Sequence, residues 1–366
     1  MRIGILGGGQ LGRMMGLAGH PLGISCRTLE PGAVCPSSPV AEHHPGDYED
    51  LQALYRFSQG VDAVTYEFEN VPVESARWLA ERVPVYPSPQ ALEIAQERVG
   101  EKTFFQGLGV KVPPFAAINS RDEFDQAIRK IGLPAVLKTT RFGYDGKGQT
   151  VIRDHTEVEP AWQILGGRPL ILEGFVPFDR ELSILGVRSR TGECVFYPLV
   201  ENVHRAGILR RSSAPAANIS ESLLNQAREI ARRAMEAMNY VGVLAVELFQ
   251  TGDQLLVNEM APRVHNSGHW TIEGSETSQF ENHLRAVAGL PLGSTDSRGH
   301  SVMLNLIGNW PTPSAILAVP GAHLHLYGKS PRPNRKVGHI TIREDNKQEL
   351  NEKTGQIQKL IDQAED

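Results

Sequence analysis

Short apolar runs alternate with helix-like stretches along the first part of the chain. Apolar runs that predict strands occupy residues 2–6, 24–30 and 62–69. Helices are predicted over residues 10–18 and after Pro72. Strands that alternate with helices in this way are typical of a parallel sheet with right-handed crossovers. We therefore expect an α/β domain that ends near Pro87-Ser88-Pro89.

The pattern changes after this domain and suggests antiparallel strands. The predicted strands are residues 134–140, 149–153, 168–176, 181–189 and 194–200. Residues 221–239 carry apolar side chains at helical spacing, which predicts an amphipathic helix against a core through Leu224, Ala227, Ala231, Ala234 and Met238. After Pro291 we expect further short strands, and then a polar tail from about Glu344.

Composition narrows the class of protein. The chain has 366 residues, and its formal net charge of −5 argues against nucleic acid as a partner, since phosphate contacts need clustered Lys and Arg. No apolar stretch reaches the ~20 residues that span a bilayer, so no membrane partner is expected. Cys26, Cys35 and Cys194 lie far apart without C-x-x-C spacing, which predicts reduced thiols, no zinc site and a cytoplasmic protein.

The first glycine-rich stretch, GILGGGQLGRM, contains the spacing G-x-G-x-x-G at Gly7, Gly9 and Gly12. Glu30 follows at about the distance where a dinucleotide enzyme keeps its ribose-binding acid. This motif raises the hypothesis of a nicotinamide or flavin enzyme, and the rest of the chain has to support or oppose it.

A second glycine-rich stretch, KTTRFGYDGKGQ, spans residues 138–149. Lys138 ends an apolar strand, and Gly143, Gly146, Lys147 and Gly148 follow in a loop that leads into another strand. Glycines let backbone N–H groups approach phosphate oxygens, and the lysines add positive charge. The Walker A spacing is absent, so this is a different phosphate loop, or else a flexible hairpin with an incidental lysine.

Two acidic residues are expected to meet on a β-hairpin. Residues 241–249 and 254–260 flank a turn at 251–253. Strict alternation places Val243, Ala245 and Glu247 on one face, and likewise Leu255, Val257 and Glu259. Adjacent buried carboxylates repel unless a cation lies between them, which predicts a Mg²⁺ site. The alternative is a pair of solvated acids at a strand edge.

These parts, together with the strand segment EGFV at 173–176, resemble the ATP-grasp superfamily. Within it the chain is similar to the 5-(carboxyamino)imidazole ribonucleotide synthetases of purine biosynthesis. Seven blocks carry the resemblance in order from residue 7 to about 340: GGGQLGRM, YEFENVP, KTTRFGYDGKGQ, VPFDRE, NEMAPRVHNSGHWT, TSQFE and YGK…NRKVGH. Phe142 departs from the pattern, because some members carry glycine there.

The resemblance implies a mixed α/β fold in three parts. Residues 1–95 would form a Rossmann-like substrate-binding domain that has lost dinucleotide binding. Residues 96–295 would form the ATP-grasp domain, with a lid at about 112–175. Residues 296–366 would form a small β-rich domain that completes the substrate phosphate site. Glu30 then becomes an ordinary strand-end acid, while the helix after the glycines still offers N–H groups to an anion.

The implied reaction is ATP-dependent carboxylation of 5-aminoimidazole ribonucleotide by bicarbonate through carboxyphosphate. ATP and Mg²⁺, with Mn²⁺ possible, are the expected cofactors, and neither NAD nor biotin is expected. Glu247 and Glu259 would hold the metal. The other nucleotide-binding residues implied are Arg98, Lys138, Gly143, Tyr144, Asp145, Gly146, Lys147, Gly148, Gln149, Glu173, Gly174, Phe175, Val176, Glu181, His204 and Asn258.

The block RVHNSGH would carry the carboxylation chemistry. Arg263 is suited to grip carboxyphosphate with its fork of donors, and His265 could orient that group or handle a proton. Lys138, Tyr144 and Asp145 complete the implied catalytic set, with the last two near the substrate base. The implied substrate-binding residues are Gln10, Leu11, Glu69, Asn266, Lys329, Arg335 and Lys336.

A homodimer and hand-off of the product to the downstream mutase are further expectations of the resemblance. Three alternatives remain open at this point. A sibling ATP-grasp enzyme, such as formate-dependent glycinamide ribonucleotide transformylase, would use another acyl donor. A Rossmann dehydrogenase rests only on the first thirty residues, and a nucleotide sensor would lack Arg263 or the acid pair.

Overall fold

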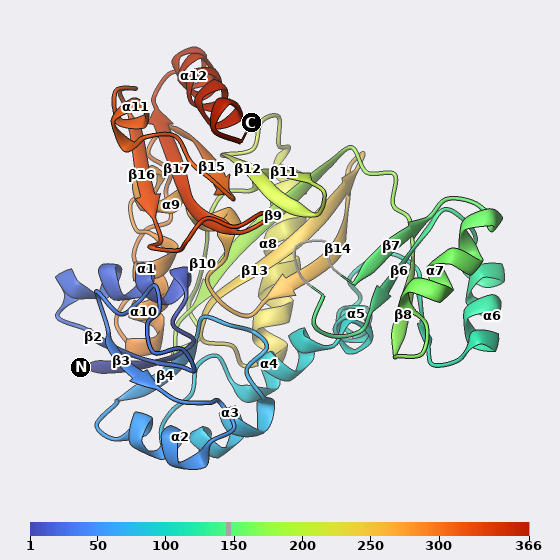
Figure 1. Cartoon of the computed structure of the whole chain (residues 1–366), viewed down its shortest axis with the longest axis horizontal. Helices are drawn as coiled ribbons and strands as arrows, with labels where there is room; N and C mark the ends of the chain where they lie inside the picture. The colour runs from blue at the N-terminus through green and yellow to red at the C-terminus, as the bar shows by residue number, and fades with distance from the viewer. Residues whose placement is uncertain (144–147, 366) are drawn as a thin grey trace.

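The computed structural model describes residues 1–143 and 148–365. Its first part is a parallel sheet in the order β3-β2-β1-β4 (Figure 1). The strands are β1 Arg2–Leu6, β2 Ser25–Glu30, β3 Glu42–Pro45 and β4 Ala63–Tyr66, with helices α1 Gln10–Gly19, α2 Leu51–Ser58 and α3 Val73–Ala80. The prediction of a parallel α/β domain is confirmed, and Pro72 is the N-cap of α3.

Two short helices lead out of this domain. They are α4 Pro89–Gln96 and α5 Arg98–Gly107. The Ser88 hydroxyl accepts the N–H of Ala91 and so caps α4, while the Glu97 carboxylate caps α5 by accepting two N–H groups. Charged residues of α5 are buried: Glu101 and Lys102 are 2% and 0% exposed. This burial is unusual for charged residues and places α5 at the base of the site described below.

A small antiparallel sheet in the order β5-β8-β6-β7 forms the separate lobe at the right of Figure 1. Its strands are β5 Phe115–Ile118, β6 Ala135–Thr139, β7 Gln149–Ile152 and β8 Leu170–Gly174. Helices α6 Arg121–Ile131 and α7 Val158–Leu165 pack on it around a core of its own that includes Phe124 and Leu137. The lobe carries Lys138 near the end of β6.

A nine-stranded sheet forms the centre of the chain, in the order β14-β13-β9-β11-β12-β15-β17-β16, with β10 beside β9. The strands are β9 Arg180–Arg188, β10 Cys194–Phe196, β11 Val200–Arg205, β12 Ile208–Ala214, β13 Gly242–Thr251, β14 Gln254–Ala261, β15 His300–Ile307, β16 Ala322–Leu326 and β17 Lys336–Glu344. All their pairings are antiparallel. Because β12 pairs with β15, the C-terminal strands extend the sheet of the preceding part.

Helices cover both faces of this sheet. Helix α8 Glu221–Ala237 packs on β9, β13 and β14, and its predicted apolar face is confirmed except for the half-buried Leu224. Helix α10 Gln279–Ala288 packs on β13 and also on α1, so it joins the first domain to the central sheet. In the sequence, the short elements η3 Asn266–Gly268 and α9 Thr271–Gly274 lie between β14 and α10.

The polar tail expected from Glu344 is an amphipathic helix, α12 Lys347–Glu365. Leu350, Ile357 and Ile361 are buried against β15 and β17, and α11 Pro313–Leu317 lies beside them. Sequence reasoning missed this helix because its apolar residues are sparse among many polar ones. No helix in the described part of the chain has the length and apolar character needed to cross a membrane.

Candidate active site

The two predicted metal ligands face each other through an irregularity in the strand pairing. Leu248 of β13 pairs with Val257 of β14, whereas the preceding residue, Glu247, pairs with Glu259. The register therefore shifts by one residue, and Asn258 is the extra residue of a β-bulge. Directly paired residues of an antiparallel ladder project to the same face, so the two carboxylates are neighbours.

The prediction that Leu255, Val257 and Glu259 share one face is wrong. Leu255 and Val257 pack in the core beneath α8, and the bulge turns Glu259 to the opposite face, where Glu247 lies. Without the bulge, Asn258 would oppose Glu247 and the carboxylate of Glu259 would point toward α8, because a one-residue slip exchanges the two faces. The carboxylates are close as predicted, but alternation alone would have separated them.

Positive side chains surround Glu259 more closely than Glu247. Arg98 donates to Oε2 of Glu259 at 2.8 Å. Burial opposes ionisation of Glu259, but the positive charges of Arg98 and Lys138 outweigh it and lower the pKa of this carboxyl. Burial, together with the charge of Glu259, raises the pKa of Glu247 to about 7. A cation between the carboxylates would stabilise both in the ionised form.

The acid pair fits a divalent cation that also binds phosphate oxygens. Oδ1 of Asn258, on the bulge, is buried and has no hydrogen-bond partner among residues 1–143 and 148–365. Carboxylate and amide oxygens are ligands that Mg²⁺ accepts, together with water and nucleotide phosphates. Across the described residues, no group of three or more His, Cys, Asp or Glu side chains is arranged to hold a metal alone. Phosphate oxygens and water would complete the coordination of a metal held by Glu247, Glu259 and Asn258.

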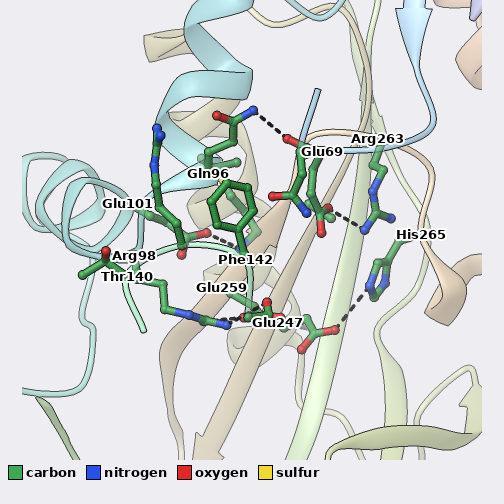
Figure 2. Close-up of a pocket in the computed structure, with 16 residues that line it drawn as sticks. Glu69, Gln96, Arg98, Glu101, Thr140, Phe142, Glu247, Glu259, Arg263 and His265 are labelled. Atoms are coloured by element: carbon green, nitrogen blue, oxygen red, sulfur yellow. Dashed lines mark hydrogen bonds and ion pairs between the residues drawn. The ribbon is translucent and has the colours of Figure 1, made fainter. Parts of the chain in front are cut away.

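A cleft of about 340 Å³ brings together most of the predicted site residues. It opens between the small sheet and the central sheet and is lined by Glu69, Arg98, Lys138, Gly143, Gln149, Phe175, Glu181, His204, Glu247, Asn258, Glu259, Arg263, His265, Asn266 and Lys336, among others. Figure 2 shows the adjoining pocket, where Arg98 points to Glu259 and His265 points to Glu247.

The cationic end of β6 is held by a buried carboxylate. Lys138 Nζ lies 3.0 Å from Oε2 of Glu173, and Lys102 Nζ lies 3.6 Å from the same oxygen. Burial works against ionisation of Glu173, but Lys138 and Lys102 outweigh it and lower its pKa. Glu173 is only 2% exposed and therefore anchors the two lysines inside the protein.

In the segment Glu173–Val176, which is expected to contact adenine, two backbone N–H groups are already hydrogen-bonded within the protein. The N–H of Gly174 donates to the carbonyl of Pro114 at 2.8 Å, and that of Phe175 donates to Pro134 at 3.1 Å. These two N–H groups therefore do not face a nucleotide, contrary to the expectation for the whole run through Val176. Phe175 is 44% exposed and lines the cleft, so its ring is available for an adenine face.

His204 and Glu181, on the neighbouring strands β11 and β9, form a second polar pair in the cleft. Nδ1 of His204 lies 2.6 Å from Oε2 of Glu181. Burial alone would lower the pKa of His204, but the hydrogen bond with Glu181 and the charge of Glu247 raise it. The pair therefore places a hydrogen-bonded imidazole in the cleft, near the position expected for phosphates.

The RVHNSGH block lies on the side of the Glu247–Glu259 pair opposite to Arg98. Nη2 of Arg263 is 2.5 Å from Oε2 of Glu69, and Nε2 of His265 is 3.4 Å from Oε1 of Glu247 (Figure 2). Burial and the charge of Arg263 lower the pKa of His265 well below its usual value, so its ring is neutral. The side-chain amide of Asn266 is buried without a hydrogen-bond partner among the described residues, and it faces the cleft.

The residues expected to bind the substrate phosphate divide into two groups. Lys329 donates a hydrogen bond to the side chain of Gln10, and Lys336 lines the cleft. These contacts bring the C-terminal part against the glycine loop, as expected. Arg335 instead donates to the carbonyl and hydroxyl of Ser330 and does not line the cleft, so the structure does not bring it to the site.

The anion site at the start of α1 is filled by the protein's own carboxylate. Glu67 accepts N–H groups from Gly9 at 2.6 Å and from Leu11 and Gly12 at 3.0 Å. The expectation that these groups remain open to an anion is therefore wrong. The N–H of Leu11 is used by Glu67 and its side chain packs in the core, so neither is directed at a substrate.

Glu30 is more than the ordinary strand-end acid that was expected. Its Oε2 accepts the N–H of Gly8 at 3.0 Å and the hydroxyl of Tyr48 at 2.9 Å. A side chain at Gly8 would collide with Cys35 and with Glu30 itself. The glycines of the opening motif thus serve close packing of two carboxylates against the loop, rather than approach of a pyrophosphate.

Tyr144, Asp145, Gly146 and Lys147 lie outside the described residues, so their expected contacts remain predictions. The ends of their loop are described. The carbonyl of Gly143 accepts a hydrogen bond from Arg98, and Gly148 has a φ of +70° with the hydroxyl of Thr139 close to where a side chain would begin. Phe142 has a φ of +60°, a conformation that glycine adopts more easily.

Three acidic or basic residues that shape the site escaped prediction: Glu67, Glu101 and Lys102. Glu67 stands two residues before the predicted Glu69, at the end of a strand that follows the glycine motif. Glu101 and Lys102 look like ordinary polar residues of a helix surface, and only their burial sets them apart. Charged neighbours in an otherwise amphipathic helix give no sequence signal of burial.

Comparison with known proteins places the chain in a family. Residues 1–96 match the ribonucleotide synthetase preATP-grasp domain, residues 103–280 match the ATP-grasp domain, and residues 301–353 match the phosphoribosylaminoimidazole carboxylase C-terminal domain. The N5-carboxyaminoimidazole ribonucleotide synthase of Pseudomonas aeruginosa is 49% identical, over 99% of this chain and 100% of the relative. That of Bacillus subtilis is 41% identical, over 93% and 90%.

Solved structures agree. The N5-carboxyaminoimidazole ribonucleotide synthetase of Thermus thermophilus superposes with a TM-score of 0.95 at 59% identity, over 98% of each chain. The N5-carboxyaminoimidazole synthase of Aspergillus clavatus, solved with ADP and 5-aminoimidazole ribonucleotide, gives a TM-score of 0.91 at 33% identity, over 99% of this chain and 97% of that one. Both the arrangement of the cleft and these likenesses lead to one conclusion: the chain belongs to the N5-carboxyaminoimidazole ribonucleotide synthase family of ATP-grasp enzymes.

Proposed function

We propose that this protein carboxylates the exocyclic amine of 5-aminoimidazole ribonucleotide, using ATP and bicarbonate, and releases ADP and phosphate. The observation that supports the proposal most strongly is the placement of two groups on either side of the Glu247–Glu259 pair. The cations Arg98 and Lys138 lie on one side, and Arg263 with His265 on the other. A site so divided can hold a triphosphate and a second anion next to its terminal phosphate.

Phosphoryl transfer is the first step. Bicarbonate is a weak electrophile, so one of its oxygens attacks the γ-phosphorus of ATP, ADP leaves, and carboxyphosphate forms. Catalysis of such a step depends on positioning and charge neutralisation more than on a protein nucleophile. Mg²⁺ held by Glu247, Glu259 and Asn258 would neutralise phosphate charge. Arg98 and Lys138 supply further positive charge from this chain, and His204 lines the same cleft.

Carboxyl transfer follows at the Arg263 side. The fork of Arg263 is suited to hold the carboxyphosphate dianion in place of its present partner, Glu69. The amine attacks the carboxyl carbon, or the CO₂ released from it, and phosphate departs. Nδ1 of His265 accepts the N–H of Ser267 at 3.3 Å, so the neutral ring carries its hydrogen on Nε2, which lies 3.4 Å from Oε1 of Glu247. His265 is therefore suited to orient the carboxyl group by donating a hydrogen bond from Nε2, and the departing phosphate can take the proton that the amine nitrogen loses.

The ribonucleotide is proposed to bridge the first domain and the C-terminal part. Lys329, beside Gln10, and Lys336 are the cations suited to its phosphate, and Glu69 and Asn266 are close enough to the acid pair to meet the sugar or the base. The Aspergillus clavatus relative was solved with 5-aminoimidazole ribonucleotide and ADP, which supports this choice of substrate. We also propose a cytoplasmic homodimer that passes its product to the downstream mutase.

An omission experiment tests the reaction. ADP release is followed with purified protein and MgATP while bicarbonate, 5-aminoimidazole ribonucleotide or Mg²⁺ is left out in turn. Full turnover is expected only with all components, and formate in place of bicarbonate is expected to give none. Turnover with formate would favour the formyl-transferring alternative. ADP release at the full rate without the amine substrate would refute the proposed carboxylation, whereas slow bicarbonate-dependent release would not, because carboxyphosphate forms before the amine reacts.

A further inference from the structure

The bulge that brings Glu259 opposite Glu247 is held from outside the sheet by two consecutive residues of α5. Strand β14 is at the edge of the central sheet, so one row of its backbone groups lacks a partner strand. Nζ of Lys102 donates to the carbonyls of Val257, at 3.3 Å, and of Asn258. Oε1 of Glu101 accepts the N–H of Met260 at 2.6 Å. The two side chains therefore bind the backbone on both sides of Glu259.

Burial of the Glu101 and Lys102 side chains is unfavourable in free energy. Lys102 is 0% exposed and Glu101 is 2% exposed, and transfer of charged groups out of water is unfavourable unless they are paired and hydrogen-bonded. Lys102 has a carboxylate partner, Glu173, at 3.6 Å. Ordinary edge strands leave such backbone groups to water, which does not require buried charges. The unfavourable burial is understandable if these hydrogen bonds fix a backbone geometry that strand β14 would not keep without them.

What they fix is the register. The other edge of β14 can pair with β13 in two ways, with the bulge or without it. In the regular pairing Asn258 would oppose Glu247, and Glu259 would turn toward the apolar core beneath α8. Lys102 binds the carbonyl of the extra residue, Asn258, and so favours the bulged pairing specifically.

We propose that Glu101 and Lys102 are positioning residues for the metal site. They hold the bulge at Asn258 and thereby keep the carboxylate of Glu259 and the amide of Asn258 turned toward Glu247. Neither side chain touches the metal in this account. The inference rests on the proposed function only for the identity of the site, and it concerns metal affinity rather than carboxylation.

The test measures Mn²⁺ binding in the presence of ADP, by the electron spin resonance signal of free Mn²⁺, without bicarbonate or the amine substrate. Lys102→Met and Glu101→Leu are expected to raise the Mn²⁺ dissociation constant by about tenfold or more, as loss of supporting bonds around metal ligands usually does. Glu101→Gln keeps an acceptor oxygen for Met260 and is expected to bind Mn²⁺ as the unmodified protein does.

Arg27→Met is the matched control for loss of a buried cation. Arg27 is 8% exposed and donates to the carbonyls of Phe57 and Gln59, but in the first domain, away from the metal site. It is expected to lower thermal stability and leave Mn²⁺ affinity unchanged. ADP affinity in EDTA is measured for every variant, because a direct role of Lys102 toward phosphates would reduce it.

Wild-type Mn²⁺ affinity in folded Lys102→Met and Glu101→Leu would overturn the proposal, and so would an equal loss of ADP affinity in EDTA. If Lys102→Met does not fold, the contrast between Glu101→Leu and Glu101→Gln decides alone. Failure of carboxylation by the unmodified protein would refute the proposed function without affecting these Mn²⁺ measurements, so the two failures are distinguishable.

Discussion

The carboxylate of Glu67 accepts the N–H of Gly9 at 2.6 Å, in the place where a dinucleotide-binding domain would hold a pyrophosphate. Leu11 and Gly12 donate to the same carboxylate. A helix N-terminus that already binds an anion of the chain cannot bind a second anion without losing the first. The sequence does contain the glycine motif, but the group that its N–H donors bind is the carboxylate of Glu67.

Nicotinamide cofactors are therefore expected not to bind. Calorimetric titration with NAD⁺, NADH and NADPH should show no saturable binding, whereas MgATP should raise the melting temperature of the same sample. The physical reason is that the pyrophosphate would have to displace Glu67 from three N–H donors. Micromolar binding of any of the three dinucleotides would refute this account of the motif.

Glu259→Gln is expected to abolish turnover and leave the fold intact. The amide still accepts a hydrogen bond from Arg98, but one negative charge facing the metal is lost. Such charge effects at a catalytic site amount to about 3 kcal/mol or more, or at least a hundredfold in kcat. Steady-state rates at saturating Mg²⁺ measure the loss, and near-normal rates would show that the metal assignment is wrong. Glu276→Gln, at an exposed ion pair with Arg298, is the control and should retain full activity.

Arg263→Ala is expected to separate nucleotide binding from carboxylation. Arg263 lies on the Glu69 side of the acid pair, while Arg98 and Lys138 lie on the nucleotide side. The variant should bind MgATP nearly as well as the unmodified protein and lose mainly kcat, because the interaction strengthens in the transition state. Arg263→Lys retains the charge but not the fork and should recover little. A large loss of MgATP affinity with unchanged kcat would contradict the assignment.

Acid is expected to destabilise the junction between the first domain and the central sheet through His283. Its Nδ1 accepts the N–H of Val243 at 3.0 Å, and its Nε2 lies 2.7 Å from Thr65 Oγ1. Burial lowers the pKa of His283 to about 4. Between pH 6.5 and 4, His283 is therefore protonated in the unfolded chain but stays neutral in the folded protein. Stability present above pH 6.5 is lost as the pH falls, by about 2 kcal/mol between pH 7 and pH 5.

Urea unfolding at pH 7 and at pH 5 measures this effect. His283→Gln cannot titrate and should lose less stability over that interval than the unmodified protein. The difference between the two proteins isolates His283 from other buried histidines such as His269 and His339, whose pKa values burial also lowers. Equal losses in both proteins would contradict the assignment.

Much of the fold follows from local patterns in the sequence. The parallel strands of the first domain, the helix over residues 221–237 and the hairpin of β13 and β14 all have the periodicity that their burial requires. Helix α12 was missed because its few apolar residues are spaced among many polar ones. Its helical state depends on docking to β15 and β17, which local propensity does not report.

The site was predictable where function fixes residue type, and less so where tertiary contacts fix geometry. Glu247 and Glu259 could be named because a metal needs carboxylates, and Arg263 could be named from the resemblance of its sequence block to the family. The bulge at Asn258 was not predicted, because strict alternation was assumed along β14 and because the bulge is held by Lys102, far away in the chain. For the same reason the sequence did not show that Glu67 fills the glycine loop.

The central claim, that bicarbonate is activated by phosphoryl transfer, is tested most directly with bicarbonate labelled with ¹⁸O. The reaction is run with unlabelled MgATP and 5-aminoimidazole ribonucleotide, and the phosphate released is analysed by mass spectrometry. If a bicarbonate oxygen attacks the γ-phosphorus, each phosphate released carries one oxygen from bicarbonate. Phosphate free of label, formed together with carboxylated product, would contradict the account.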